Sequence, residues 1–177
     1  MMQQRKIELR DIVIIGMLAA ICVIATTIKI PYGHGAMVHL GTAAIFTIGI
    51  VFGGVYAGLA AAIGTAFFDL MMGFSPYTIW SFFIKGTAGF VVGYVSNGLW
   101  PENIVPKQAL LRSIVGMLLA ATCTLAGYII AWWQVSGSIV VAIGNIPSSL
   151  ISSTVGFVVA SIIAPKLRQV LKNNRLI

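Results

Sequence analysis

Residues 55–85 read VYAGLAAAIGTAFFDLMMGFSPYTIWSFFIK, two apolar runs joined by the short loop 73–76. The first run contains one ionisable side chain near its end, Asp69, and the second contains Lys85. Placing such a group at bilayer depth costs about 2.5–3.5 kcal/mol on insertion scales. Ionisable groups at that depth normally face a bundle interior or a water-lined cavity. This stretch therefore predicts a membrane protein with a polar pocket.

The composition of the whole chain indicates the same class. Hydrophobic residues make up 59% of the 177 residues and charged residues only 8%, against about 25% in soluble domains. Apolar runs of spanning length recur along the chain, so we expect one all-α integral membrane domain over residues 1–177. Six transmembrane helices are expected, at about 12–30, 38–52, 55–72, 77–96, 109–133 and 139–163. Pro147 is expected to interrupt the last helix and Pro165 to end it.

The net charge of +7 does not indicate nucleic-acid binding, because the basic residues gather at helix ends. Nine of the eleven lie in three short segments, namely Arg5, Lys6 and Arg10; Lys107 and Arg112; and Lys166, Arg168, Lys172 and Arg175. Six spans put all three segments on one side of a cell membrane. The positive-inside rule makes that side cytoplasmic, together with both termini.

No pattern of residues supports catalysis or a cofactor. The chain has no HExxH, GxSxG, CxxC or Walker-type motif, and its two histidines are too few for a convincing metal site. Cys22 and Cys123 lie within apolar runs and are interpreted as small packing residues. We therefore expect neither catalytic residues, nor a metal, nor a cofactor.

Polar and aromatic side chains are expected to meet near the outer ends of the helices and to bind a substrate. The candidates are His34, His39, Asp69, Tyr77, Trp80, Lys85, Trp132, Trp133, Gln134 and Asn145. Aromatic faces would stack a flat ring, and the amide and imidazole groups would hydrogen-bond it. Each group has a structural alternative. Asp69 and Lys85 fit an ion pair equally well, the tryptophans an aromatic belt, the histidines structural hydrogen bonds, and the break at Asn145–Pro147 a packing kink.

Small residues four apart predict where helices approach closely. Gly49 and Gly53, Gly54 and Gly58, Ala60 and Gly64, and Gly89 and Gly93 are such pairs. Gly16 and Ala20 form another pair in the first helix, where a smooth face suits either internal packing or a second membrane protein.

Four segments in this order resemble the substrate-binding S component of an energy-coupling factor (ECF) vitamin transporter. They are 11–20 (DIVIIGMLAA), 51–58 (VFGGVYAG), 64–70 (GTAFFDL) and 80–89 (WSFFIKGTAG). Within that group the chain looks most similar to S components for hydroxymethylpyrimidine or a related small ring such as pyridoxine. The resemblance implies a six-helix protein of the cell membrane that binds a vitamin or precursor from outside, with the first loop as a lid.

The resemblance also implies the partners. They are a transmembrane coupling subunit and two cytoplasmic ATPases, which would hydrolyse ATP on behalf of this non-enzymatic subunit. The coupling subunit would contact a small-residue face of the first helix at Gly16, Ala19, Ala20 and Val23.

Other functions remain as alternatives at this stage. A carboxylated vitamin such as pantothenate would need Lys85 without an ion-pair partner. A small intramembrane enzyme would have only Asp69 and His39 as an acid–base pair. A structural membrane subunit would bind no small molecule.

Overall fold

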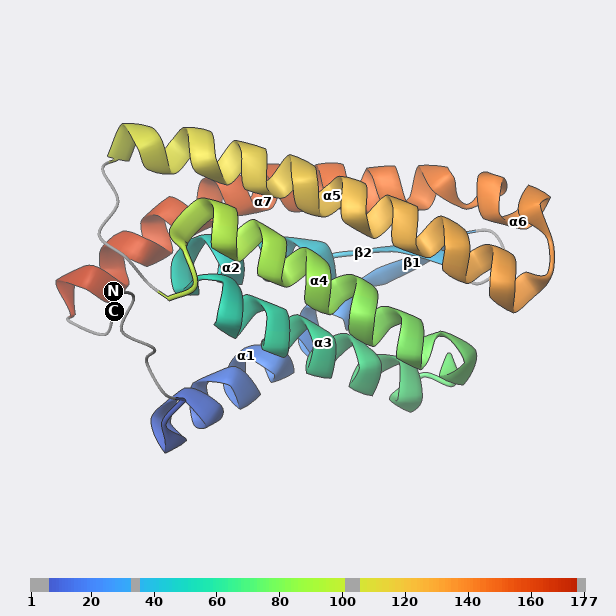
Figure 1. The fold of residues 1–177 in the computed structure, drawn as a ribbon, viewed down its shortest axis with the longest axis horizontal. Helices are drawn as coiled ribbons and strands as arrows, with labels where there is room; N and C mark the ends of the chain where they lie inside the picture. The colour runs from blue at the N-terminus through green and yellow to red at the C-terminus, as the bar shows by residue number, and fades with distance from the viewer. Residues whose placement is uncertain (1–6, 33–35, 101–105, 175–177) are drawn as a thin grey trace.

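The chain folds into a bundle of helices with one short β-hairpin (Figure 1). The computed structural model describes residues 7–32, 36–100 and 106–174. The helices are α1 (Leu9–Thr27), α2 (Gly41–Phe52), α3 (Gly54–Met71), α4 (Thr78–Asn97), α5 (Pro106–Ser136), α6 (Ile139–Gly144) and α7 (Ile146–Asn173). A 3-10 turn, η1 (Ser75–Tyr77), precedes α4. The start of α1 and the end of α7 lie at the same end of the bundle (Figure 1).

The predicted all-α membrane fold is confirmed. Five helical segments are long and apolar enough to cross a membrane, at 9–27, 54–71, 75–97, 109–136 and 139–173. The second of the six predicted spans, at 38–52, is shorter than expected, because α2 has only 12 residues. At 1.5 Å per residue it covers about 18 Å of a hydrocarbon core about 30 Å thick.

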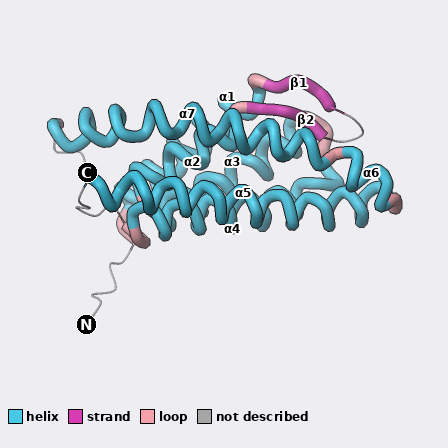
Figure 2. The backbone as a smooth tube through the Cα atoms, turned by 90° about the horizontal axis from the view of Figure 1, so that it is seen from above, coloured by secondary structure: helices cyan, strands magenta, loops and turns pink. Residues whose placement is uncertain are grey.

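A β-hairpin replaces the loop predicted at 31–37. Its strands β1 (Lys29–Tyr32) and β2 (Ala36–His39) pair antiparallel, with Lys29 opposite His39 and Tyr32 opposite Ala36. Strand pairing satisfies backbone groups that would otherwise lack partners away from water. Figure 2 shows the hairpin lying over the bundle beside α7. Strand β2 thus includes residues 38 and 39, where the second helix was predicted to begin.

Glycine and alanine bring α3 and α4 into backbone contact. A Cβ atom added at Gly89 would collide with the carbonyl oxygen of Ala57, and one at Gly93 would lie 2.6 Å from the carbonyl oxygen of Gly53. Gly64 of α3 meets α1 in the same way, because an added Cβ would lie 2.7 Å from the carbonyl oxygen of Ala19. The predicted small-residue pairs on α3 and α4 are therefore used inside the bundle.

The face of α1 predicted to contact a partner needs correction at one residue. Ala19 is buried against α3 and is not accessible to a partner. Gly16 and Ala20 are exposed, Val23 is half-buried, and no atom lies within 4 Å of a Cβ added at Gly16. The error arose because helical spacing groups residues by angle but does not say which side the neighbouring helix covers.

A buried carboxylate fixes the beginning of α1 to α3. Asp11 is fully buried and accepts a 2.6 Å hydrogen bond from the hydroxyl of Tyr56. Its second oxygen accepts the backbone N–H of Glu8 at 3.0 Å, as in a capping box. This burial was not expected from the sequence, because Asp11 lies beside the charged residues Glu8 and Arg10.

The two prolines of the last segment behave differently. Pro147 lies in the first turn of α7, directly after the break that follows α6, which confirms the predicted interruption. Pro165 does not end the helix, because α7 continues to Asn173. The residues beyond it have tertiary contacts: Leu167 and Leu171 pack against the core, and Arg168 donates to Asn97 at 2.8 Å. These contacts offset the hydrogen bond that proline removes.

Replacing Gly89 tests the close approach of α3 and α4. We expect Gly89→Ala to lower the free energy of unfolding by about 1–3 kcal/mol, the usual cost of overpacking. Thermal unfolding of the purified protein in detergent measures the effect. Gly16→Ala is the matched control, since its methyl group meets no atom within 4 Å, and it should leave the midpoint unchanged or slightly raised. Equal midpoints for both variants would contradict the packing described here.

Candidate functional site

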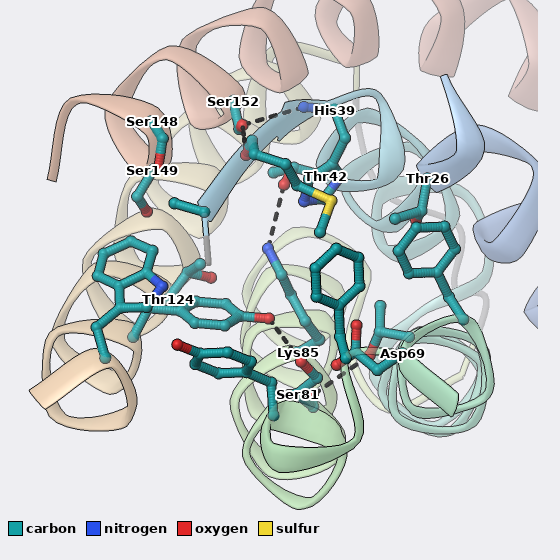
Figure 3. A pocket seen from close by; sticks show the side chains of 18 of the residues that line it. Thr26, His39, Thr42, Asp69, Ser81, Lys85, Thr124, Ser148, Ser149 and Ser152 are labelled. Carbon is teal, nitrogen blue, oxygen red and sulfur yellow. Dashed lines mark hydrogen bonds between the residues drawn. The ribbon is translucent and has the colours of Figure 1, made fainter. Parts of the chain in front are cut away.

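A cavity lies at the end of the bundle opposite the start of α1. Its wall is formed by helices α1, α2, α3, α4, α5 and α7, together with η1 and β2 (Figure 3). Its volume is about 60 Å³, and it is partly open at the mouth. Its lining residues are Thr26, Ala36, Met37, His39, Thr42, Thr65, Phe68, Asp69, Phe74, Tyr77, Ser81, Lys85, Thr124, Tyr128, Trp132, Ser148, Ser149, Ser152 and Ser153.

Hydroxyl groups dominate the lining. Eleven of the nineteen residues are serine, threonine or tyrosine. Ser148 and Ser149 recur four positions later as Ser152 and Ser153, so both pairs lie on one face of α7. This spacing was visible in the sequence and could have revealed the wall, but it was not used. A hydroxyl both donates and accepts, so the cavity suits a ligand with several polar substituents.

Lys85 and Asp69 both reach the cavity without forming an ion pair with each other. The ammonium group of Lys85 donates to the Thr42 hydroxyl at 3.2 Å and lies 5.3 Å from the centre of the Tyr128 ring (Figure 3). Oδ2 of Asp69 is buried and has no hydrogen-bond partner. Burying a carboxylate oxygen without a hydrogen-bond partner costs free energy, because its hydrogen bonds to water are lost and not replaced. A donor supplied by a bound ligand would remove that cost.

Aromatic rings form the other part of the wall. Tyr128 and Trp132, one turn apart on α5, have ring centroids 5.5 Å apart and planes inclined by 30°. Trp132 is only 4% exposed, although α5 is a membrane-spanning helix. On the opposite side Lys29 lies over the rings of Phe68 and Phe74, at 4.7 and 5.0 Å from their centroids. The rings offer stacking faces for a flat ligand.

The hairpin is attached to α7 beside the cavity. The Ser152 hydroxyl accepts from the backbone N–H of His39 at 3.3 Å and donates to the carbonyl of Met37 at 3.4 Å. Nδ1 of His39 accepts the N–H of Gly41 at 3.1 Å, which leaves Nε2 as the protonated nitrogen of the neutral ring. Strand β2 therefore closes one side of the cavity through bonds to α7 and α2.

Five of the ten predicted site residues line the cavity: His39, Asp69, Tyr77, Lys85 and Trp132. His34 lies outside the described residues. Four predictions are not supported by the position of the side chain. Trp133 and Gln134 are exposed, Trp80 is half-buried outside the lining, and Asn145 is buried at the α6–α7 break but does not line the cavity. Trp133 is adjacent to Trp132 in sequence, and the helix turns it about 100° away, toward lipid.

Acidic and metal-binding side chains are sparse around this cavity. Among the residues that the structure describes, no group of three His, Cys, Asp or Glu side chains is placed to hold a metal ion. The polar chemistry of the site therefore rests on hydroxyl groups, one ammonium, one carboxylate and one imidazole.

Comparison with known protein families identifies one that matches most of the chain. A family model described as "ECF-type riboflavin transporter, S component" matches residues 6–169. A Pyrococcus woesei protein described as "Uncharacterized protein in gap 3'region" is 28% identical over 102 residues. That match covers 58% of this chain and 62% of the relative, so the chain spans less than two thirds of the relative's length.

A solved structure has the same fold. It is described as "Structure and mechanism of the S component of a bacterial ECF transporter" and superposes with a TM-score of 0.66. The match covers 92% of this chain and 98% of the solved one, at 17% sequence identity. At that identity the likeness establishes the architecture alone.

The protonation of His39 gives a pH-dependent test of how tightly β2 is held. Burial lowers the pKa of His39 to about 3, and the positive charges of Lys85 and Lys29 act in the same direction. The unfolded chain has the ordinary histidine value near 6.5, so it binds the proton first as the pH falls. We expect stability to be complete above about pH 6.5 and to decline below it, by at most about 1.4 kcal/mol per pH unit.

The control is His39→Gln, which retains a hydrogen-bond acceptor but cannot titrate. The unfolding midpoints of the two proteins should change in parallel as the pH falls from 8 to about 6.5. Below that pH, the midpoint of the wild type should fall more steeply than that of the variant. A wild-type curve that stays parallel down to pH 4 would show that the imidazole is protonated freely in the folded protein.

Proposed function

The chain belongs to the family of ECF-type riboflavin transporter S components, and from this membership we propose that it captures a vitamin for an ATP-driven importer. As a member, it is a multi-pass protein of the cell membrane and a transporter subunit rather than an enzyme. The observation that supports capture most directly is the cavity, which combines stacking faces with unused hydrogen-bonding capacity at Asp69.

Riboflavin is the substrate we propose. The family description names riboflavin, and it gives no support to the narrower assignment to hydroxymethylpyrimidine or pyridoxine. Riboflavin has a flat three-ring system and a chain of hydroxyl groups. The Tyr128 and Trp132 rings suit the former, and the serines of α7 suit the latter.

Asp69 and Lys85 would recognise the polar edge of the ring system. The imide of a flavin presents one N–H donor between two carbonyl acceptors. Oδ2 of Asp69 would accept from the N–H group, and Lys85 would donate to a carbonyl once its bond to Thr42 is exchanged. Both bonds involve a charged partner and so are stronger than neutral ones.

The partners follow from the family. A transmembrane coupling subunit would contact α1 at Gly16, Ala20 and the exposed part of Val23, where small side chains permit close helix approach. Two cytoplasmic ATPase subunits would supply the free energy of transport. The hairpin β1–β2 would act as the lid of the cavity, because β2 already forms part of its wall.

A second candidate substrate is an anionic vitamin such as pantothenate. The observation that favours it is the ammonium group of Lys85, which lies at the cavity and forms no ion pair with Asp69. Against it, Asp69 lines the same cavity and would repel a carboxylate.

Ligand identification tests the proposal directly. Mass spectrometry of small molecules released from detergent-purified protein should detect riboflavin. Calorimetry should give saturable binding of riboflavin, with a higher affinity than for hydroxymethylpyrimidine, pyridoxine or pantothenate.

We expect Lys85→Ala to weaken the binding of riboflavin by about 1.5–3 kcal/mol, the contribution of one charge-assisted hydrogen bond. An anionic ligand would lose about 3–5 kcal/mol. Binding of pantothenate alone would refute the riboflavin proposal, and binding of none of the four would refute capture of these vitamins.

Adjacent tryptophans provide a matched pair for the stacking face. Trp132 lines the cavity, whereas Trp133 is 49% exposed on the outside of the bundle. We expect Trp132→Leu to weaken binding by about 1–3 kcal/mol, the usual contribution of aromatic stacking on a flat base. Trp133→Leu should leave the dissociation constant unchanged. Quenching of riboflavin fluorescence measures both, and equal effects would exclude stacking on Trp132.

A further inference from the structure

A second and larger cavity lies between α5 and α7 at the other end of the bundle, where α5 begins and α7 ends (Figure 1). Its volume is about 540 Å³, and it is partly open to the surface. No residue is shared with the first cavity. This volume lies within the usual 300–1000 Å³ of small-molecule sites, and the proposed transport function does not use the cavity.

The wall of this α5–α7 groove is apolar and smooth. Met117 of α5 and Ala160 and Ala164 of α7 are buried along it, and Ile50 of α2 contributes from below. The hydroxyl of Ser113 donates to the carbonyl of Ala109 in its own helix, so it needs no acceptor from a molecule bound in the groove. Leu110 is largely exposed at the margin. Because both helices cross the membrane, the groove opens toward hydrocarbon, and an acyl chain suits such a wall.

The rim of the groove carries positive charge. Arg168 and Lys172 are four residues apart on α7, so both side chains lie on the groove side of the helix. A hydrogen bond of 2.8 Å from its guanidinium group to Oδ1 of Asn97 anchors Arg168 at this end of the bundle. The positive-inside pattern places this end at the cytoplasmic leaflet, whose lipids include anionic ones.

We propose that the α5–α7 groove binds an anionic phospholipid of the cytoplasmic leaflet. The phosphate lies against Arg168 and Lys172, and an acyl chain follows the wall past Leu110 and Met117. The combination of apolar length and a cationic rim selects this occupant, since a partner helix would need no pair of positive charges and a free anion would need no apolar groove.

Native mass spectrometry of the intact chain in detergent tests the proposal. Dioleoyl phosphatidylglycerol is titrated against dioleoyl phosphatidylcholine, which has the same acyl chains and no net charge. We expect a phosphatidylglycerol adduct that Arg168→Gln combined with Lys172→Gln weakens about 30-fold, as two basic side chains of about 1 kcal/mol each would give. Lys166→Gln is the matched control, because Lys166 is exposed on the same helix but does not line the groove.

Ser161→Trp tests the groove without altering charge, because Ser161 lines it and an indole there would fill it. This variant should also lose the adduct, while ligand binding in the first cavity reports that the protein is folded. If Arg168→Gln prevents folding, Lys172→Gln and Ser161→Trp decide the question.

Three results would overturn the proposal. Phosphatidylcholine could bind as well as phosphatidylglycerol, the adduct could survive both the charge change and Ser161→Trp, or inorganic phosphate alone could displace the lipid. Loss of coupling-subunit binding in Ser161→Trp with an unchanged lipid adduct would instead identify the groove as a protein interface.

Discussion

The hydrocarbon of a bilayer supplies no hydrogen-bond partners, so every polar group at that depth must be satisfied within the protein. Most of the described residues follow this constraint, and the exceptions among their buried side chains are Oδ2 of Asp69 and the hydroxyl groups of Thr78 and Ser96, of which only Asp69 lines the first cavity. Thr26 and Thr65 donate to carbonyls one turn back in their own helices, and the strands of the hairpin pair with each other. Against that background the unpartnered carboxylate oxygen of Asp69 is informative, because the same constraint predicts that something absent from the protein alone completes it.

The bundle combines a tightly packed part with an open part. Along α1, α3 and α4 glycine and alanine lie at several contacts, so backbone atoms of these helices approach closely there. Along α5 and α7 the two helices enclose space at both ends, one end polar and the other apolar.

The two cavities differ in the chemistry of their linings, and each lining suits a different kind of ligand. The first gathers hydroxyl, aromatic and charged groups from distant parts of the chain, which suits a solute with many polar substituents. The second has a nearly uniform apolar wall with charge only at its rim, which suits an amphiphile. A vitamin and a lipid could therefore occupy the same subunit at once without sharing a residue.

The sequence by itself determined the class and the number of spans, because hydrophobic length is a local property. It did not determine the end of the last helix, which continues past Pro165 to Asn173 because of contacts with distant segments. The sequence also singled out Asp69, Lys85, Tyr77, Trp132 and His39, since a polar or aromatic group in an apolar run stands out without any structure. Only the tertiary structure showed that Trp132 and not Trp133 lines the cavity, that Ala19 is buried, and that the predicted loop forms a hairpin. It also collected the hydroxyl wall from helices far apart in the chain. The side of a helix that a neighbour covers depends on packing between distant segments, and no local pattern carries that information.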